Sequence, residues 1–451
     1  MTLCFNAVRP HNALRYPFSA PKTAPPRRTS ASVPRSRVME ETRSLKPDMK
    51  KPTLVELCRA TFYIGTVGYG GPAILALMKR TLVDRRKWIS EREFMNALSL
   101  AQILPGATGV SVMGYIGFKL HKLWGGILAP LFYILPATVA MTTLAWAYFR
   151  FGNISFVKAL FAGLGALVVA LLLNATWILG RSVFKRLDAR DIKGLVISLT
   201  TFVGIYFLNI NIVWLIFTAG LLGFVLFYFT REFEGERAAS GEALLSEPRA
   251  LEREPLGARD FVPVVAAMGV LGLGLLLPST RALLTTFLSI GALAFGGGFT
   301  SIPLIQHQVV DAHAWLTVKQ FLDGIALGQI TPGPVFITAT FVGYHVAVIA
   351  GALFATLAIF TPSLTAMIAL ADVHARVQNL KIVKVVVKGF LSGFIGLLIA
   401  VTLRFAFKSL VSWQAWLIFV GAVVWLIVLK RDSAWAILGT IALSLLIFQW
   451  W

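Results

Sequence analysis

The segments GYGGP at 68–72 and RRKWISEREFMNALSLAQILPGA at 85–107 return in altered form as FGGGF at 295–299 and AWLTVKQFLDGIALGQITPGP at 314–334. The tryptophan at position 88 matches the one at 315, an offset of 227 residues, and most other matches keep that offset. In each copy, glycine and proline interrupt an apolar segment. Interrupted segments at corresponding places in two halves mark the binding site of secondary transporters, so the pattern predicts a duplicated transporter fold.

The composition indicates a membrane protein. Of the 451 residues, 57% are hydrophobic and 14% are charged, and the mean hydropathy is +0.75. A soluble chain of this size could not bury so much apolar surface, so we expect an all-α polytopic protein in a lipid bilayer. The net charge of +21 lies largely in an N-terminal extension and in short loops, which favours positive-inside topology over a nucleic-acid partner.

Four regions are predicted. Residues 1–53 form a basic extension rich in Arg, Ser and Pro, which is typical of a disordered tail, an organellar transit peptide or an over-extended gene start. Residues 54–229 form the first repeat, 230–260 a charged linker, and 261–451 the second repeat. Apolar segments long enough to cross a bilayer are expected at 54–78, 95–118, 123–149, 155–180, 194–229, 261–278, 283–306, 321–345, 347–371, 381–407, 411–429 and 433–449.

Matching loops of the two repeats carry opposite charge bias. The loop 79–92 holds six Lys and Arg residues, whereas its counterpart 306–320 holds only Lys319. The loop 181–193 is likewise richer in basic residues than 407–419. Because basic loops stay in the cytoplasm, the pattern predicts an inverted repeat with broken or re-entrant helices. The alternative is that the charges of the loops drifted after the duplication, without any inversion of the second half.

The breaks are the candidate substrate site. Gly and Pro unwind a helix within a membrane, and the half-helix that follows offers backbone N–H groups and a positive dipole end to an anion. Simple kinks or close helix packing through small residues would leave the same pattern. The candidate substrate-binding or translocation residues in the breaks are Gly70, Gly71, Pro72, Pro105, Gly106, Gly296, Gly297, Gly298, Pro332, Gly333 and Pro334.

Polar side chains beside the breaks complete the candidate set. Thr108 and Ser111 follow one break and Thr338 follows the other, so their hydroxyls could cap a half-helix and donate to an oxyanion. The alternative is that these hydroxyls only form hydrogen bonds to backbone carbonyls. Gln102 and Gln329 could act as neutral hydrogen-bond donors at membrane depth. The alternative is that their side chains form hydrogen bonds between helices.

Charged residues in and near the spans are few. Arg85 and Arg86 could funnel an anion to the pore, or could only set topology. Ser90 and Glu93 have capping-box spacing, so a helix is expected to begin there. Arg404 is expected to snorkel toward the membrane surface. Other expectations are that Trp88 anchors the chain at the membrane interface and that His345 lies at the interface without coupling transport to protons.

Sequence signatures of enzymes are missing. The chain contains no P-loop, no GxSxG motif, no HExxH motif and no Cys/His cluster, so we expect no enzyme activity, no cofactor and no metal. A membrane-embedded enzyme would need an ionisable pair within the spans, and none stands out. An enzyme or receptor built on a transporter-like scaffold is the alternative of another class.

The motifs resemble those of the chromate ion transporter family in its long two-domain form. The similarity rests on GGP at 70–72, RRKWISEREF at 85–94 and LPGA at 104–107, and on FGGG, WLT, TPGP and FVGY in the second half. The resemblance implies a secondary transporter that exports chromate and confers resistance. Ala107 stands where the family has proline, and sulfate is the related tetrahedral dianion, so another anion is the alternative substrate.

The expected location is the plasma (inner) membrane, with an organellar membrane as the alternative. Chromate or sulfate and the lipid bilayer are the expected partners. A homodimer is compatible with the sequence.

Overall fold

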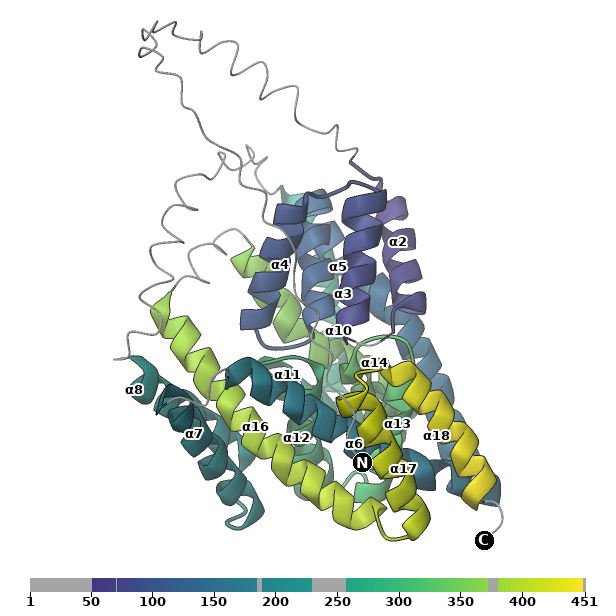
Figure 1. The fold of residues 1–451 in the computed structure, drawn as a ribbon. Helices are drawn as coiled ribbons and strands as arrows, with labels where there is room; N and C mark the ends of the chain where they lie inside the picture. Colours follow the sequence, from purple (N-terminus) through teal and green to yellow (C-terminus); the bar gives the residue numbers. More distant parts are fainter. Residues whose placement is uncertain (1–50, 70, 185–188, 229–256, 372–379, 449–451) are drawn as a thin grey trace, which may run out of the picture. The chain divides into compact units, whose positions relative to one another are not determined.

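The structure is a computed structural model and describes residues 51–69, 71–184, 189–228, 257–371 and 380–448. These residues form helices without a strand, as the sequence predicts. The N-terminal extension up to residue 50, most of the charged linker and Gly70 lie outside the described residues. Figure 1 shows the arrangement of the helices.

The helices follow one another in two comparable series. The first comprises α2 (Leu54–Val67), α3 (Gly71–Lys79), the π-helix η1 (Arg80–Arg85), α4 (Glu91–Ile103), α5 (Thr108–Phe151), α6 (Ser155–Val183), α7 (Ala189–Tyr206) and α8 (Ile212–Tyr228). The second comprises η3 (Ala258–Phe261), α10 (Val262–Leu276), α11 (Pro278–Leu293), η4 (Gly298–Thr300), α12 (Ser301–Gln306), the π-helix η5 (His307–Ala312), α13 (Val318–Ile330), η6 (Val335–Ile337), α14 (Thr338–Leu370), α16 (Lys381–Ser409), α17 (Trp413–Val423), the π-helix η7 (Val424–Val428) and α18 (Ser433–Phe448).

The duplication is visible in the local structure. Helices α4 and α13 each begin with a capping box, formed by Ser90 and Glu93 in one and by Thr317 and Gln320 in the other. A π-helix precedes each of them at the same offset. The capping box expected at Ser90 is therefore confirmed, and a second one occupies the equivalent place.

The predicted spans 54–78 and 283–306 are each divided by a break. Helix α2 has 14 residues, which at 1.5 Å per residue is about 21 Å and too short for a hydrocarbon core of about 30 Å. Its C-cap, Gly68, is extended, and α3 begins three residues later. Ala294 likewise ends α11 directly before the run of glycines. The interruption predicted at each run of glycines is therefore present, because the backbone there leaves the helical hydrogen-bond pattern.

Helices α5 and α14 each contain a tight reversal. The backbone leaves helical geometry at His121 and Lys122 in α5, and at Ala347 and Val348 in α14. A Cβ atom added to Gly117 would lie 2.1 Å from the carbonyl oxygen of Gly125. Residues eight apart in a continuous helix are about 12 Å apart, so the two parts of α5 fold back on each other as a hairpin. The reversal falls at the boundaries predicted between spans.

The matched helices of the two series lie toward opposite ends of the fold. Figure 1 shows α2, α3 and α4 above α12 and α13. Helix α2 packs on α5 as α11 packs on α14, and α5 and α14 pack on each other. This arrangement agrees with the inverted repeat that the loop charges predict.

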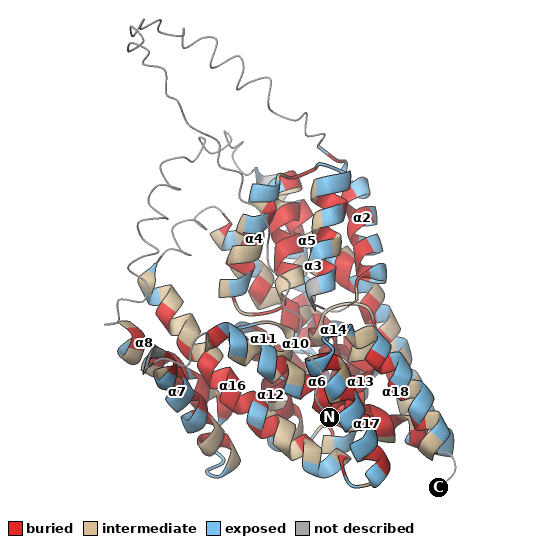
Figure 2. Cartoon of the chain, in the orientation of Figure 1, coloured by how far each residue is buried: buried red, intermediate tan, exposed pale blue. Residues whose placement is uncertain are grey.

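Among the described residues, five helical segments are long and apolar enough to cross a membrane: Thr108–Phe151, Ser155–Val183, Arg259–Leu276, Val335–Leu370 and Lys381–Ser409. The first and the fourth of these contain the reversals of α5 and α14. Three shorter apolar helices accompany them. Large apolar side chains such as Trp214, Leu276 and Trp435 are exposed on the outer helices, where lipid would cover them. Figure 2 shows the buried faces turned toward neighbouring helices and the exposed faces turned outward.

Candidate functional site

Each half has a Pro-Gly turn, here called its tip, at Pro105-Gly106 in the first half and at Pro332-Gly333 in the second. Each tip is hydrogen-bonded to the first break of the other half, which follows α2 or α11. The N–H of Gly106 donates to the carbonyl oxygen of Ala294 over 2.8 Å, and the N–H of Gly333 donates to the carbonyl oxygen of Gly68 over 3.2 Å. Ala294 and Gly68 are the C-caps of α11 and α2. The two halves therefore exchange the same kind of contact in both directions. All four breaks are therefore joined in pairs at the contact between the halves.

Glycine is required at both tips. The φ angles of Gly106 and Gly333 are +105° and +125°, a region that side chains disfavour. A Cβ atom on Gly106 would lie 2.4 Å from Cβ of Ser363 in α14. On Gly333 it would lie 2.7 Å from Cβ of Ala137 in α5. Each tip thus lies against the long helix of the opposite half.

The first break of the second half, at residues 294–298, has a backbone conformation similar to that of the tips. Gly296 and Gly297 have φ angles of +93° and +105°, and a Cβ atom on Gly298 would lie 2.9 Å from Cβ of Val335. The contact brings the break at 294–298 beside the start of η6, which follows the tip at Gly333. The two breaks of the second half therefore lie together, next to the tip of the first half.

Helical segments begin directly after each break. Helix α3 starts at Gly71 and α5 at Thr108, while η4 and η6 start at Gly298 and Val335. The residues that precede α5, η4 and η6 make no side-chain hydrogen bond to cap them. The cap expected from Thr108 is not made, because Ala107 is the N-cap. The first backbone N–H groups of such segments have no partner within their own helix.

Two buried polar side chains beside the breaks lack a hydrogen-bond partner. The Oγ atom of Ser111 and the Nε2 atom of Gln329 are both buried and have no partner among the described residues. Thr338 differs, because its hydroxyl donates to the carbonyl oxygen of Val335. Gln102 differs as well, because it is exposed. Ser111 and Gln329 are therefore the candidate donors that the fold leaves available.

The arginines of the candidate funnel lie away from the breaks. Arg85 and Arg86 are exposed in the segment between α3 and α4. Helix α4 has 13 residues, so its other end, where the break lies, is about 20 Å away. The guanidinium of Arg86 stacks 4.7 Å above the ring of Trp88. Trp88 is only 7% exposed, so it belongs to the core, and the interface anchor expected there is wrong.

Two polar contacts were not anticipated from the sequence. Arg404 bonds to Asp311 and to the carbonyl oxygen of Ile205, so it does not simply snorkel. The buried carboxylate of Asp323 accepts a hydrogen bond of 2.7 Å from the hydroxyl of Tyr148. Asp323 is the only acid in the run 318–330, and an acid in the middle of an apolar segment was the available signal.

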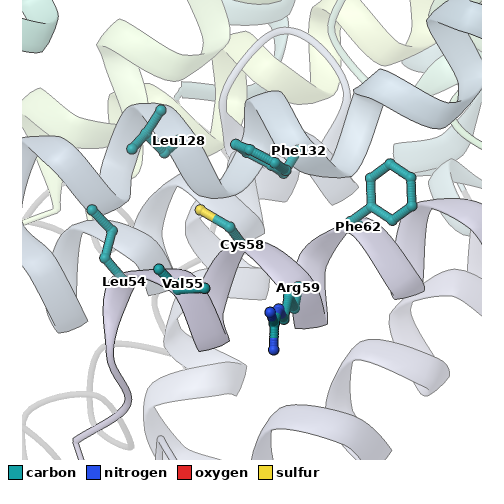
Figure 3. A pocket seen from close by; sticks show the side chains of 7 residues that line it. All are labelled: Leu54, Val55, Cys58, Arg59, Phe62, Leu128 and Phe132. Atoms are coloured by element: carbon teal, nitrogen blue, oxygen red, sulfur yellow. The ribbon is translucent and has the colours of Figure 1, made fainter.

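Two surface cavities lie apart from the breaks. One of about 570 Å³ lies between α2 and α5 and is lined by apolar side chains including Cys58, Leu128 and Phe132. Figure 3 shows Arg59 pointing away from Leu128 and Phe132. The other, of about 640 Å³, lies between α7 and α8. Both linings are almost wholly apolar, which suits lipid chains better than an anion.

An all-α, multi-pass membrane protein whose two related halves meet at paired broken helices has the architecture of a secondary transporter. A family model described as chromate transporter matches residues 55–224 and 281–445, and the chain belongs to this family. It is therefore a membrane transporter and not an enzyme.

Known relatives cover most of the chain. An uncharacterized transporter of Methanocaldococcus jannaschii is 34% identical over 375 residues, which cover 82% of this chain and 88% of the relative. The chromate transport protein of Cupriavidus metallidurans is 29% identical over 401 residues, covering 87% and 94%. That of Pseudomonas aeruginosa is 29% identical over 369 residues, covering 81% and 83%. No solved structure matches the chain.

Proposed function

We propose that this protein carries chromate across the membrane through the paired breaks, and that its transport residues are those of the two tips and their neighbours. The observation that carries the proposal is the reciprocal bonding of Gly106 to Ala294 and of Gly333 to Gly68. It joins four interruptions, and non-helical backbone at membrane depth is tolerated only where protein buries it or where it lines a water-filled cavity.

The chemistry of the breaks suits a tetrahedral oxyanion. The segments 68–72, 104–107, 294–300 and 331–335 contain no charged residue. Their donors are backbone N–H groups at helix starts, together with the unpartnered Oγ atom of Ser111 and Nε2 atom of Gln329. Neutral donors of this kind can bind an anion and release it again, which a carrier requires more than tight binding.

Chromate is favoured over sulfate by the names of the relatives, since two of those described above are chromate transport proteins. Sulfate has the same charge and shape, so it is the second candidate. Export from the cytoplasm, with chromate resistance as its result, is the direction that the family resemblance implies. The plasma (inner) membrane is the proposed location, and a homodimer is one assembly that purification can test.

Flux of anion into proteoliposomes tests the proposal. Purified full-length protein is reconstituted, and chromate uptake is followed with and without competing sulfate at two pH values. Saturable chromate flux that empty vesicles lack supports the proposal. Sulfate flux without chromate flux would replace chromate by sulfate, and the absence of flux for both would contradict an oxyanion carrier.

A further inference from the structure

Asp323 is an acid enclosed in the membrane part of the fold. Its side chain belongs to α13, about one and a half turns after the helix begins, and the residue is 4% exposed. An ionised carboxylate in such surroundings is costly, and acids at membrane depth are characteristic of ion and proton pathways. Nothing in the anion site described above uses this residue.

The hydrogen-bond partner of Asp323 comes from the other half. The hydroxyl of Tyr148 in α5 donates to Oδ2 of Asp323 over 2.7 Å. The ring of Tyr148 packs edge-on against Phe161 and Phe341, with centroid distances of 5.0 and 5.4 Å. The bond is therefore surrounded by aromatic side chains, and a neutral hydroxyl is a weak substitute for a cation.

Few charges face this carboxylate. Lys319 lies one turn earlier on α13 and acts on it electrostatically. Among the neighbouring helices, α14 carries His345, which bonds to the backbone of Trp315 and whose ring lies tilted against that of Phe149, with the centroids 4.6 Å apart. Helix α6 carries Lys158, which is exposed, and α16 carries Arg404, which is bound to Asp311. Helix α18 has no titratable residue.

The same helix leads from Asp323 to the anion site. Helix α13 ends at Ile330, directly before the break at 331–334. Seven residues at 1.5 Å each place the carboxylate about 10 Å from that break. A negative charge at this distance in a medium of low dielectric constant repels a dianion. In α4, the position equivalent to Asp323 is Asn96, so the duplicated scaffold accommodates a neutral amide there.

We propose that Asp323 is a proton-binding site linked to the anion site, and that it takes up one proton when the anion binds at the break. The proton comes from water and converts the carboxylate to a neutral carboxyl, so the net charge of the loaded site changes from −3 to −2. Binding of proton and anion then favour each other to the same degree, because linkage is reciprocal. Proton binding and anion binding favour each other whether the protein exports the anion or takes it up. This inference rests on the proposed function.

Anion binding as a function of pH tests the proposal. Chromate affinity of the purified full-length protein is measured from mildly alkaline to mildly acidic pH, for wild type, Asp323→Asn, Asp323→Glu and Asp84→Asn. We expect wild type to bind about tenfold more tightly at the acidic end, with Asp323→Asn binding tightly throughout. Asp323→Glu should keep the pH dependence. Asp84 is exposed, so Asp84→Asn serves as the control and should behave as wild type.

Chromate itself takes up a proton in mildly acidic solution, but this affects every variant equally, and sulfate repeats the test without that change. Equal pH dependence in wild type and Asp323→Asn would overturn the proposal, as would a wild-type affinity that does not change with pH.

Infrared difference spectra give a readout that needs no anion. A protonated-carboxyl band that appears in wild type on acidification and is missing in Asp323→Asn supports the proton site. Its absence from wild type would overturn it. If wild type binds no anion while this band titrates, the proposed function fails and the proton site stands.

Discussion

The N–H of Gly106 donates to the carbonyl oxygen of Ala294 across 2.8 Å, and this bond joins the tip of the first half to the break of the second. Its counterpart from Gly333 to Gly68 makes the connection mutual. Two interrupted helices could be independent kinks. Four interruptions bonded in reciprocal pairs form one centre, and the predictions below follow from that centre and from the fold that holds it.

A side chain at the first tip should impair transport. Gly106→Ala places a Cβ atom 2.4 Å from Cβ of Ser363 at a φ angle of +105°. The strained backbone alone costs about 1–3 kcal/mol. We expect chromate flux per inserted molecule to fall at least tenfold. Adding Ser363→Gly removes the clash but not the strain, so the double variant should recover part of the flux. Unchanged flux in Gly106→Ala would show that the tip is not required.

The two motif loops should face opposite sides of the membrane. Arg86 and His313 hold equivalent positions and are both exposed. Single cysteines are placed there in a chain that carries Cys4→Ser and Cys58→Ala, and intact vesicles are treated with an impermeant thiol reagent. We expect one position to react from outside and the other only after the vesicles are opened. Labelling of both from the same side would contradict the inverted repeat.

Much of this fold can be predicted from the sequence because the duplication repeats each signal, so that one half can be compared with the other. The matched interruptions, the capping box at Ser90 and the boundary between spans near residue 120 all follow from residue types with strong local preferences. Opposite loop charges predict inversion, which the labelling experiment above tests. Local preference does not say, however, that the tip at Gly106 meets Ala294, because that contact depends on how the two halves pack.

The roles of Arg404, Asp323 and Trp88 could not be predicted from the sequence, because each depends on contacts that form only in the folded chain. Arg404 alone suggests snorkelling, but Asp311 lies 93 residues away and meets it only in the folded chain. Asp323 and Tyr148 are 175 residues apart. Trp88 has the residue type of an interface anchor, yet it is 7% exposed. In each case a tertiary contact decides the role of a residue whose own chemistry allows several.

The hairpins of α5 and α14 should not tolerate larger residues at their glycines. Gly117→Ala and Gly343→Ala each place a Cβ atom within 2.2 Å of a carbonyl oxygen, so the two arms must separate. We expect the free energy of unfolding to fall by about 1–3 kcal/mol or more, seen as a lower melting temperature in detergent. Gly180→Ala, where no atom lies within 4 Å, is the control and should be neutral. A melting temperature unchanged in all three would refute the hairpins.

The contact between Asp311 and Arg404 should make stability depend on pH. Burial raises the pKa of Asp311, but hydrogen bonds from His307 and Gln306 and the charge of Arg404 outweigh it, so the pKa lies below its ordinary value. A lowered pKa adds stability above the pKa of the unfolded state, about 3.9, and that stability is lost as the pH falls through the folded value.

Asp311→Asn should therefore lower the melting temperature at neutral pH, and the difference from wild type should persist down to about pH 4 and shrink below it, as the pH falls toward the lowered pKa of the folded state. Asp84, the exposed equivalent in the first half, provides the matched control, and Asp84→Asn should have little effect. A deficit in Asp311→Asn that is constant with pH would mean that the carboxylate charge is not the cause.

Chromate flux in proteoliposomes that hold Pro332→Leu with Gly333→Ala tests the central claim most directly. The two changes favour a continuous helix and remove the tip that bonds to Gly68. With equal insertion, we predict a fall of at least tenfold, about 1.4 kcal/mol or more in transition-state terms, and no change in the exposed control Arg92→Ala. Pro105→Leu with Gly106→Ala should reduce flux as well. Normal flux in both double variants would contradict the account, and the substrate would have to cross elsewhere.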